Sequence, residues 1–413
     1  MITGHERPSD DDPWPLHFDG AEPTREIHAA SGARSVTYPV IEHLDDALAH
    51  GREGVGIKVN RHARYTVIDY AYVSDDLFES AWEREFRGLK FDADGRPVAR
   101  PFHKFFNWGE RLGPDMDALD WSRPHVVMEK LDGSMVHPVV LDGDLVFMTR
   151  AGITPQAEAA LALASARQRD WAREASERGI TPILEFTAPG NRIVVAYGEP
   201  ALTLLAAREM RSGRYLTQSE LHDLAGDTVP LVQAHDPVDD PVRFLADARA
   251  RQGVEGYVIA FEDGTRIKVK ADGYVLRHKA LSALMHEKNV AAFVLEGAVD
   301  DVLPLVSPHA AGRLAAYRDA METRMDETVA RAEAFHAEHG GLERRDYAER
   351  VRETFDKRLM GLAFAAADGR DTREVLHKVM RGITGSASRI EANLDLLPPP
   401  WIVDFLDLRE IEG

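Results

Sequence analysis

The pattern of apolar residues changes at about Ala280, and this change constrains the fold more than any other feature. Before it, short β-rich runs alternate with turns and a few helices. We therefore predict an α+β region built on antiparallel strands over 24–280 and an all-helical region over 281–413. Residues 1–23, rich in Asp and Pro, are predicted to be a flexible tail. In the second region, apolar side chains recur at helical spacing at Leu314, Tyr317, Met321, Met325, Val329, Ala332 and Phe335.

Local signals place turns and caps along the first region. Asp142-Gly143 and Asp263-Gly264 each separate two β-rich runs, which predicts a hairpin at each. Thr154-Pro155 is typical of a helix start, so we predict one helix from there to Gly179. Further strands are predicted at Pro182–Phe186, Arg192–Tyr197 and Leu202–Ala206.

The composition excludes some kinds of chemistry and restricts others. The absence of cysteine excludes disulfides, thiolate metal sites and cysteine nucleophiles. The net charge of -19 is unusual for a phosphate-binding protein, but it is unevenly spread. Between Arg84 and Arg111 there are seven Lys or Arg against four Asp or Glu, and between Arg266 and Lys279 five against one. This distribution favours a focused basic cleft over promiscuous binding of polyanions.

The sequence shows no sign of a membrane segment. No apolar run approaches the length of a membrane span, and the N-terminus lacks a signal pattern. We therefore expect a cytoplasmic protein with no membrane partner.

Lys130 follows the apolar run Val126–Met128 and precedes Asp132-Gly133, which predicts a strand that delivers a lysine into a tight turn. A lysine amine is a nucleophile only when deprotonated, so such a site needs nearby cations or desolvation to lower its pKa. Lys268 and Lys270 alternate on a later strand and therefore share one side of it, where they could supply those cations. A solvated lysine at a hairpin, with a solvated pair on an edge strand, is the structural alternative.

Several short motifs occur in a fixed order, and together they resemble a known superfamily. They are Glu85–Gly88, His103–Asn107, Lys130–Ser134, Ile183–Phe186, Gly190–Tyr197, Val254–Val258 and Lys268–Lys270. The series resembles the covalent nucleotidyltransferases, which include ATP-dependent ligases and RNA capping enzymes. More narrowly, it resembles the ATP-dependent RNA ligases of the bacteriophage tRNA-repair type. The resemblance extends over roughly Phe86 to Lys279.

The resemblance implies both a fold and a reaction. The fold is an antiparallel-sheet nucleotidyltransferase (ATP-grasp-like ligase) domain, followed by a helical C-terminal domain for the choice of RNA substrate. The reaction uses ATP with Mg²⁺ or Mn²⁺. Lys130 attacks the α-phosphate of ATP to form lysyl-AMP, AMP then moves to an RNA 5′-phosphate, and a 3′-OH finally displaces AMP to join the ends.

The resemblance also implies roles for individual residues. Glu185 accepts hydrogen bonds from the ribose hydroxyls, and Glu255 orients the nucleophile or the water shell of the metal ion. Each glutamate lies amid apolar strand residues, so each could instead pair with a structural arginine. Arg87 and Lys104 bind phosphates of ATP or RNA, unless Arg87 forms a structural ion pair. Arg150 stands where the phage family typically has a lysine, which leaves its role open.

The partners implied are RNA with 5′-phosphate and 3′-OH ends, among them broken tRNA, and an end-healing kinase-phosphatase. Two alternatives remain at this point. One is a nucleotidyltransferase with another acceptor, such as DNA ends or a capping-type transfer. The other is a non-catalytic RNA-end-binding protein, against which the intact set of Lys130, Glu185, Glu255, Lys268 and Lys270 argues.

Overall fold

The structure is a computed structural model, and the chain divides into two compact units at Val275/Leu276. The predicted flexible tail over 1–23 lies outside the described residues. Among the described residues, no helix is long and apolar enough to cross a membrane. The structure describes residues 38–51, 56–71, 77–110, 113–117, 119–191 and 193–402.

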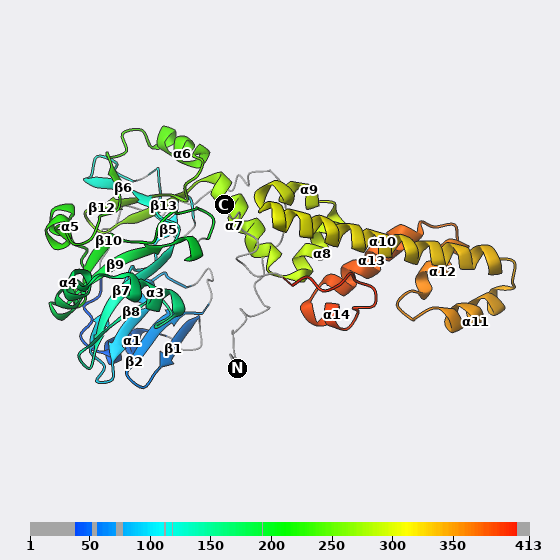
Figure 1. Ribbon diagram of the computed structural model, residues 1–413, viewed down its shortest axis with the longest axis horizontal. Coiled ribbons are helices and arrows are strands. Elements are labelled where there is room, and N and C mark those ends of the chain that lie inside the picture. Colours follow the sequence, from blue (N-terminus) through cyan, green and yellow to red (C-terminus); the bar gives the residue numbers. More distant parts are fainter. Residues whose placement is uncertain are drawn as a thin grey trace. The chain divides into compact units, whose positions relative to one another are not determined.

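The described residues of the first unit form three sheets, and the strands of the first sheet all precede Lys130 in the sequence (Figure 1). Its strand order is β1-β2-β3-β4, and all of its pairs are antiparallel. Helices α1 and α2 start at capping boxes. The elements are α1 (Leu44–His50), β1 (Ile57–Arg61), β2 (Tyr65–Tyr70), α2 (Ala81–Glu85), β3 (Leu89–Asp92) and β4 (Pro97–Ala99).

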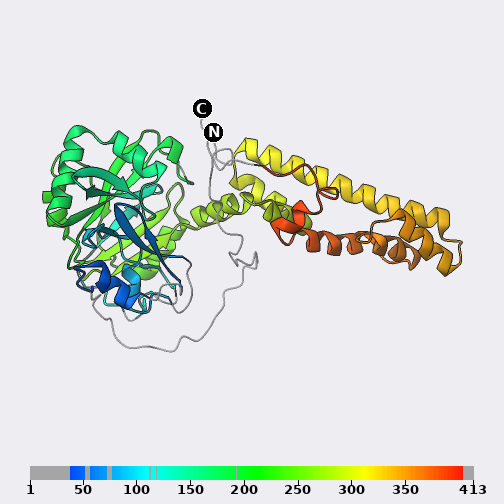
Figure 2. The same cartoon turned by 90° about the horizontal axis from the view of Figure 1, so that it is seen from below.

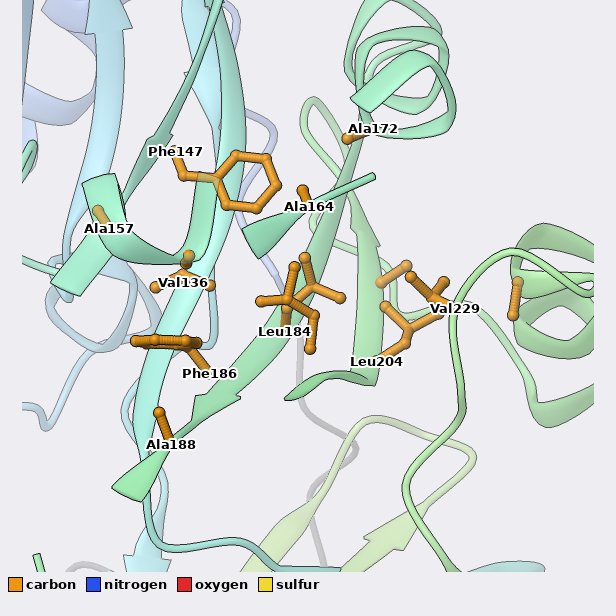
Figure 3. Packing of buried hydrophobic residues seen from close by; sticks show 14 of the residues in the cluster. Val136, Phe147, Ala157, Ala164, Ala172, Leu184, Phe186, Ala188, Leu204 and Val229 are labelled. Carbon is orange, nitrogen blue, oxygen red and sulfur yellow. The ribbon is translucent and has the colours of Figure 1, made fainter. Parts of the chain in front are cut away.

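The second sheet has the order β10-β9-β7-β8 and is also antiparallel. Its apolar side chains pack against those of the flanking helices in a buried cluster that includes Val136, Leu184 and Leu204 (Figure 3). The elements are β7 (Ser134–Leu141), β8 (Asp144–Met148), α3 (Pro155–Leu163), α4 (Ala166–Glu177), β9 (Ile180–Thr187), η1 (Pro189–Asn191), β10 (Ala201–Glu209) and α5 (Gln218–Ala225).

The third sheet has the order β11-β6-β12-β13-β5, in which only the β13–β5 pair is parallel. One of its faces packs on an apolar cluster that includes Ile259, Ile267 and Val269. Because side chains alternate along a strand, the lysines of β13 lie on the other face. The elements are β5 (Phe106–Asn107), β6 (His125–Lys130), β11 (Ala234–His235), α6 (Pro241–Ala250), β12 (Gly256–Phe261) and β13 (Arg266–Lys270).

Within the described residues, the chain from Asp272 to Ile402 forms helices and no strand. The long helix of this part is α10, seen in yellow in Figure 2, and it buries all of the predicted apolar positions except the half-buried Val329. The elements are α7 (Asp272–Leu284), α8 (Glu287–Glu296), α9 (Val299–Val302), η2 (Leu303–Leu305), α10 (Pro308–His339), α11 (Arg344–Thr354), α12 (Met360–Ala367), α13 (Thr372–Thr384) and α14 (Ala387–Glu391).

Both predicted hairpins are present, but two other predictions were wrong. The helix expected to run from Thr154 to Gly179 is two helices, because Ser165 and Gln168 form a capping box that starts a new helix. The strand expected over Arg192–Tyr197 is absent from its described part, 193–197. The backbone N–H groups of this segment bind a side chain of the candidate site instead of a neighbouring strand.

Candidate active site

Lys130 lies in a row of residues that crosses the third sheet. It is the last residue of β6 and faces Gly256 on β12, which in turn faces Lys270 on β13. Glu255 immediately precedes this row, and its buried Oε1 lies 2.7 Å from the Lys130 Nζ and 3.2 Å from the Lys270 Nζ. One carboxylate therefore holds two of the predicted site lysines together, which favours orientation of the nucleophile as its role.

The segment after Lys130 crosses from one sheet to another, so the alternative of a lysine at a hairpin does not hold here. Strand β6 belongs to the third sheet, whereas β7, which follows it, belongs to the second. The backbone of Gly133 passes so close to β9 that a Cβ atom there would lie 2.4 Å from the carbonyl oxygen of Phe186. Glycine is therefore required at this position by close packing against the second sheet.

Asp132 anchors this crossover, a role that the sequence analysis missed. Its side chain is 1% exposed, and its Oδ2 accepts hydrogen bonds from the backbone N–H groups of Val194 and Val195 at 2.6 and 2.7 Å. Its Oδ1 accepts from the hydroxyl of Tyr274 at 2.7 Å, and its backbone N–H donates to the hydroxyl of Tyr197 at 2.8 Å. The motif around 190–197 thus fixes the turn that carries the nucleophile. The one sequence feature that could have indicated this role is the position of Asp132 within the Lys130–Ser134 motif.

Glu185 lies on β9, beside the same crossover. Its side chain is buried, and its Oε1 accepts a hydrogen bond from the backbone N–H of Gly133 at 2.9 Å. Burial is the main reason that the pKa of this carboxyl is raised to about 8. The charge of Lys130 opposes the rise, and the charge of Glu255 adds a smaller increase. The two carboxyl groups and Lys130 are therefore close enough to influence one another.

This pKa predicts how stability depends on pH. The unfolded carboxyl ionises above its ordinary pKa of 4.5, but the folded one stays protonated up to about 8. Ionisation therefore favours unfolding, and the stability present at low pH is lost as the pH rises through this range. Glu185→Gln cannot ionise and keeps an oxygen for the N–H of Gly133. We expect its melting temperature to exceed that of the wild type by a margin that grows from about pH 5 to about pH 9.

The matched control for this prediction is Glu199→Gln, which replaces an exposed glutamate of the same unit that has no ion pair among the described residues. Its melting temperature should differ from that of the wild type by the same amount at each pH. A constant margin for Glu185→Gln as well would contradict the assignment of a buried, protonated carboxyl.

Lys268 lies two residues before Lys270 on β13, opposite Val258 of β12 and Asn107 of β5. Its Nζ lies 5.1 Å from the centre of the Phe105 ring. Burial is the largest cause that lowers the pKa of Lys268 to about 7, and the charges of Arg87, Lys104 and Lys130 contribute to the same decrease. Lys268 is thus a partly desolvated amine that lies close to three of the other predicted site cations.

Arg87 follows, by two residues, the glutamate of a buried ion network. Glu85 binds Arg208 at 2.8 Å and Arg100 at 3.0 Å, and all three side chains are at most 1% exposed. Burial opposes ionisation of Glu85, but the charges and hydrogen bonds of the two arginines together have the larger effect and lower its pKa to about 2. Arg87 itself contacts the sulfur of Met135 at 3.7 Å and pairs with no carboxylate among the described residues. A structural ion pair is therefore not the role that these residues give it.

Lys104 also lacks a carboxylate partner within the described part of the chain. Its backbone N–H donates to the carbonyl oxygen of Arg84 at 2.6 Å. Its Nζ lies over three aromatic rings, at 5.7 Å from the centre of Tyr70, 5.2 Å from Phe78 and 5.3 Å from Phe106. Aromatic faces attract the ammonium without neutralising it, so Lys104 remains able to bind an anion.

Arg150 is the departure from the family pattern, and it differs from Arg87 and Lys104 in having an acidic partner. Its Nε lies 3.1 Å from the Oδ2 of buried Asp69, and its guanidinium lies 4.4 Å from the centre of the Tyr70 ring. The buried Nζ of Lys90 donates to the carbonyl oxygens of Gly88 at 2.6 Å and Arg150 at 3.2 Å. The Arg150 turn is therefore fastened to the segment that carries Arg87.

The donors that could hold a metal ion are few. No three His, Asp or Glu side chains converge within the described ranges. Glu185 and Glu255 are near neighbours, but the Oε1 of Glu255 already contacts two lysines. The two carboxylates fit outer contacts to a hydrated, phosphate-bound Mg²⁺, and they do not form a cage of protein ligands.

Comparison with known proteins identifies the family. A family model described as RNA ligase matches residues 85–280, which contain all of the candidate residues. RNA ligase 1 of bacteriophage TS2126 is 31% identical over 355 residues, covering 80% of this chain and 87% of that protein. The chain belongs to the RNA ligase family. The resemblance predicted from the ordered motifs is thereby confirmed.

Other RNA ligases show weaker similarity. A candidate RNA ligase of Thermovibrio ammonificans is 29% identical over 279 residues, covering 64% of this chain and 72% of that protein. Among solved structures, an archaeal ATP-dependent RNA ligase is 20% identical with a TM-score of 0.43, covering 59% of this chain and 64% of that chain.

Proposed function

We propose that this RNA ligase family member joins RNA 5′-phosphate and 3′-OH ends with ATP, through lysyl-AMP and RNA-adenylate intermediates. The observation that carries the proposal is the contact of Lys130 with Glu255 at 2.7 Å, on a sheet face that also carries Lys268 and Lys270. A nucleophile held by a buried carboxylate among cations is suited to attack on a phosphate.

In the first step, the Nζ of Lys130 attacks the α-phosphate of ATP, and pyrophosphate leaves. Glu255 orients the amine, and Lys268 and Lys270 stabilise the charge on the phosphate oxygens, since phosphoryl transfer depends mainly on positioning and charge stabilisation. Arg87, Lys104 and Arg150 bind phosphate oxygens of ATP, or later those of the RNA end. Arg87 and Lys104 have no carboxylate partner among the described residues, so their charges are available to a phosphate.

Glu185 is suited to bind the ribose of ATP. Its second oxygen has no hydrogen bond among the described residues, whereas its Oε1 is held by the N–H of Gly133. When bound with ATP, Mg²⁺ or Mn²⁺ would neutralise phosphate charge. Glu255, and Glu185 beside it, would contact the water shell of that metal ion.

RNA as the substrate follows from the family, and repair of broken tRNA is the use that we propose. A candidate bifunctional polynucleotide kinase/RNA ligase of Autographa californica nuclear polyhedrosis virus is 28% identical over 292 residues, covering 64% of this chain and 41% of that protein. A separate end-healing kinase-phosphatase would supply the 5′-phosphate and 3′-OH ends in the present case. DNA ends and capping-type transfer are the competing acceptors.

The proposed function is tested by incubating the full chain with ATP, Mg²⁺ and matched 5′-phosphate strands of RNA or DNA. We expect joined RNA, with RNA-adenylate as a transient species, and little joined DNA. Equal joining of DNA, or transfer of AMP without any joining, would replace the RNA ligase proposal by one of the competing acceptors.

The two units of the chain suggest a division of labour. We propose that residues 24–280 form the adenylyltransferase domain and that the helices over 281–413 select the RNA substrate. All candidate site residues precede the boundary, and α7 continues across it. A fragment should therefore end after α7, at Met285, so that no helix is cut.

We expect this fragment to form lysyl-AMP and to join unstructured RNA, but to lose any preference for a nicked anticodon loop. Circular dichroism on the fragment serves as the folding control. The measurement is the ratio of joining rates on the nicked loop and on an unstructured strand, for the full chain and for the fragment. An unchanged ratio, or a folded fragment that forms no lysyl-AMP, would contradict the division.

A further inference from the structure

Tyr70, at the end of β2, contacts two of the candidate phosphate-binding cations with a single ring. The guanidinium of Arg150 lies 4.4 Å from the ring centre, and the Nζ of Lys104 lies 5.7 Å from it. The two positive charges consequently lie within about 10 Å of each other, although they belong to segments far apart in the sequence. Phe78 packs edge-on against the same ring at 5.1 Å and holds it in place.

The contacts of Arg150 leave its outer donors available. Asp69, the residue before Tyr70, contacts the Nε of Arg150 at 3.1 Å, and the guanidinium carbon of Arg150 lies over the ring of Tyr70, 4.4 Å from its centre. In the described part of the chain, no hydrogen bond engages Nη1 or Nη2 of Arg150. The last two residues of β2 thus contact this guanidinium at two points and fix its position.

We propose that Tyr70 is a positioning residue that holds Arg150 and Lys104 at a fixed spacing, so that both bind the phosphates of one ATP molecule. The proposal rests on the proposed function and adds a residue that none of the ordered motifs contains. The ring is the active part, because the attraction of a cation comes from the quadrupole of its face and not from the phenol oxygen. The hydroxyl of Tyr70 makes no hydrogen bond to the described residues.

Two substitutions separate the ring from the hydroxyl. Tyr70→Phe keeps the aromatic face, and we expect its ATP dependence to stay within about twofold of the wild type. Tyr70→Leu keeps apolar bulk against Phe78 but removes the aromatic face. We expect it to raise the ATP concentration for half-maximal lysyl-AMP formation by about tenfold, with little change in the maximal rate. Because the ring does not touch the reacting atoms, its loss should weaken ATP binding, which raises the ATP concentration for half-maximal rate and leaves the maximal rate nearly unchanged.

A double-mutant cycle distinguishes positioning from a general structural effect. In the Arg150→Ala or Lys104→Ala background, Tyr70→Leu should cost clearly less than it does alone, because the cation that it positions has already gone. In the Arg87→Ala background, its full tenfold effect should remain, because Arg87 does not lie over this ring. Tyr257→Leu is the matched control. Its half-buried ring contacts His235 and Phe244, and the ATP dependence should not change.

Additive effects in all three backgrounds would overturn the proposal, as would a Tyr70→Phe variant as impaired as Tyr70→Leu. If the wild type forms no lysyl-AMP, the proposed function fails and the same cycle is measured by equilibrium binding of ATP. Reduced cost of Tyr70→Leu in the Arg150→Ala and Lys104→Ala backgrounds would then still support the role of Tyr70. Additivity there would overturn it. Thermal melting of each variant serves as the folding control, so that ATP dependence is compared only between folded proteins.

Discussion

Glu255→Ala should lower the rate of lysyl-AMP formation by about 100-fold or more, because it removes the group that orients the nucleophile. The carboxylate contacts Lys130 and Lys270 at once, and it is 4% exposed. Without it, two ammonium groups face each other with no acceptor between them, and the amine of Lys130 loses its fixed position. Glu255→Gln keeps one acceptor oxygen and should show an intermediate loss.

The measurement is the single-turnover rate of adduct formation at saturating ATP. Glu129→Ala is the control, since Glu129 lies on the same strand as Lys130 and contacts only His235, at 3.7 Å, among the ion pairs of the described residues. A folded Glu255→Ala variant that retains more than about a tenth of the wild-type rate would show that the carboxylate does not orient the nucleophile.

Lys130→Ala should abolish both lysyl-AMP formation and the ATP-dependent joining of RNA, while joining of RNA that already carries a 5′-adenylate persists. The first step needs the amine, but the last step needs only the activated phosphate and a 3′-OH. The side chain of Lys130 is 24% exposed, and Glu255 keeps its contact with Lys270, so the variant should fold.

The control for this variant is Lys58→Ala, which removes an exposed lysine from β1 of the same unit. It should join RNA at the wild-type rate with either substrate. ATP-dependent joining by purified Lys130→Ala protein would exclude Lys130 as the nucleophile. Failure of a folded variant on adenylylated RNA would instead give Lys130 an additional role in the final step.

Some of the fold follows from local sequence signals. The hairpin of β12 and β13 was predicted because Asp263-Gly264 separates two β-rich runs, and the start of α3 because Thr154-Pro155 is typical of a helix start. In the structure, Thr154 accepts a hydrogen bond from the N–H of Ala157. The two wrong predictions have different causes: one segment contains a second helix-start signal, and in the other a long-range contact determines the backbone conformation. Ser165 starts a new helix, and the N–H groups of Val194 and Val195 bind Asp132 and not a strand.

The candidate site divides in the same way. The shared side of Lys268 and Lys270 follows from alternation along a strand, and the lysine of the nucleophile motif from its ordered neighbours. The anchoring of the crossover by Asp132 and the contacts of Tyr70 depend on which segments the sheets bring together. Such partners, far apart in the chain, have no periodicity or spacing from which to predict them.

We propose that Lys130 is the residue that becomes adenylylated. Lys268 is the alternative nucleophile that the site offers. Lys268 has a pKa of about 7, so at neutral pH it is partly deprotonated and, by that criterion alone, able to act as a nucleophile. Geometry favours Lys130, which is held by Glu255 at 2.7 Å, whereas Lys268 lies over the ring of Phe105. The direct measurement is to incubate the full chain with α-labelled ATP and Mg²⁺, digest the denatured protein, and locate the AMP adduct by mass spectrometry. We expect a single adduct on Lys130, and an adduct on Lys268, or none on either lysine, would contradict this assignment of the nucleophile.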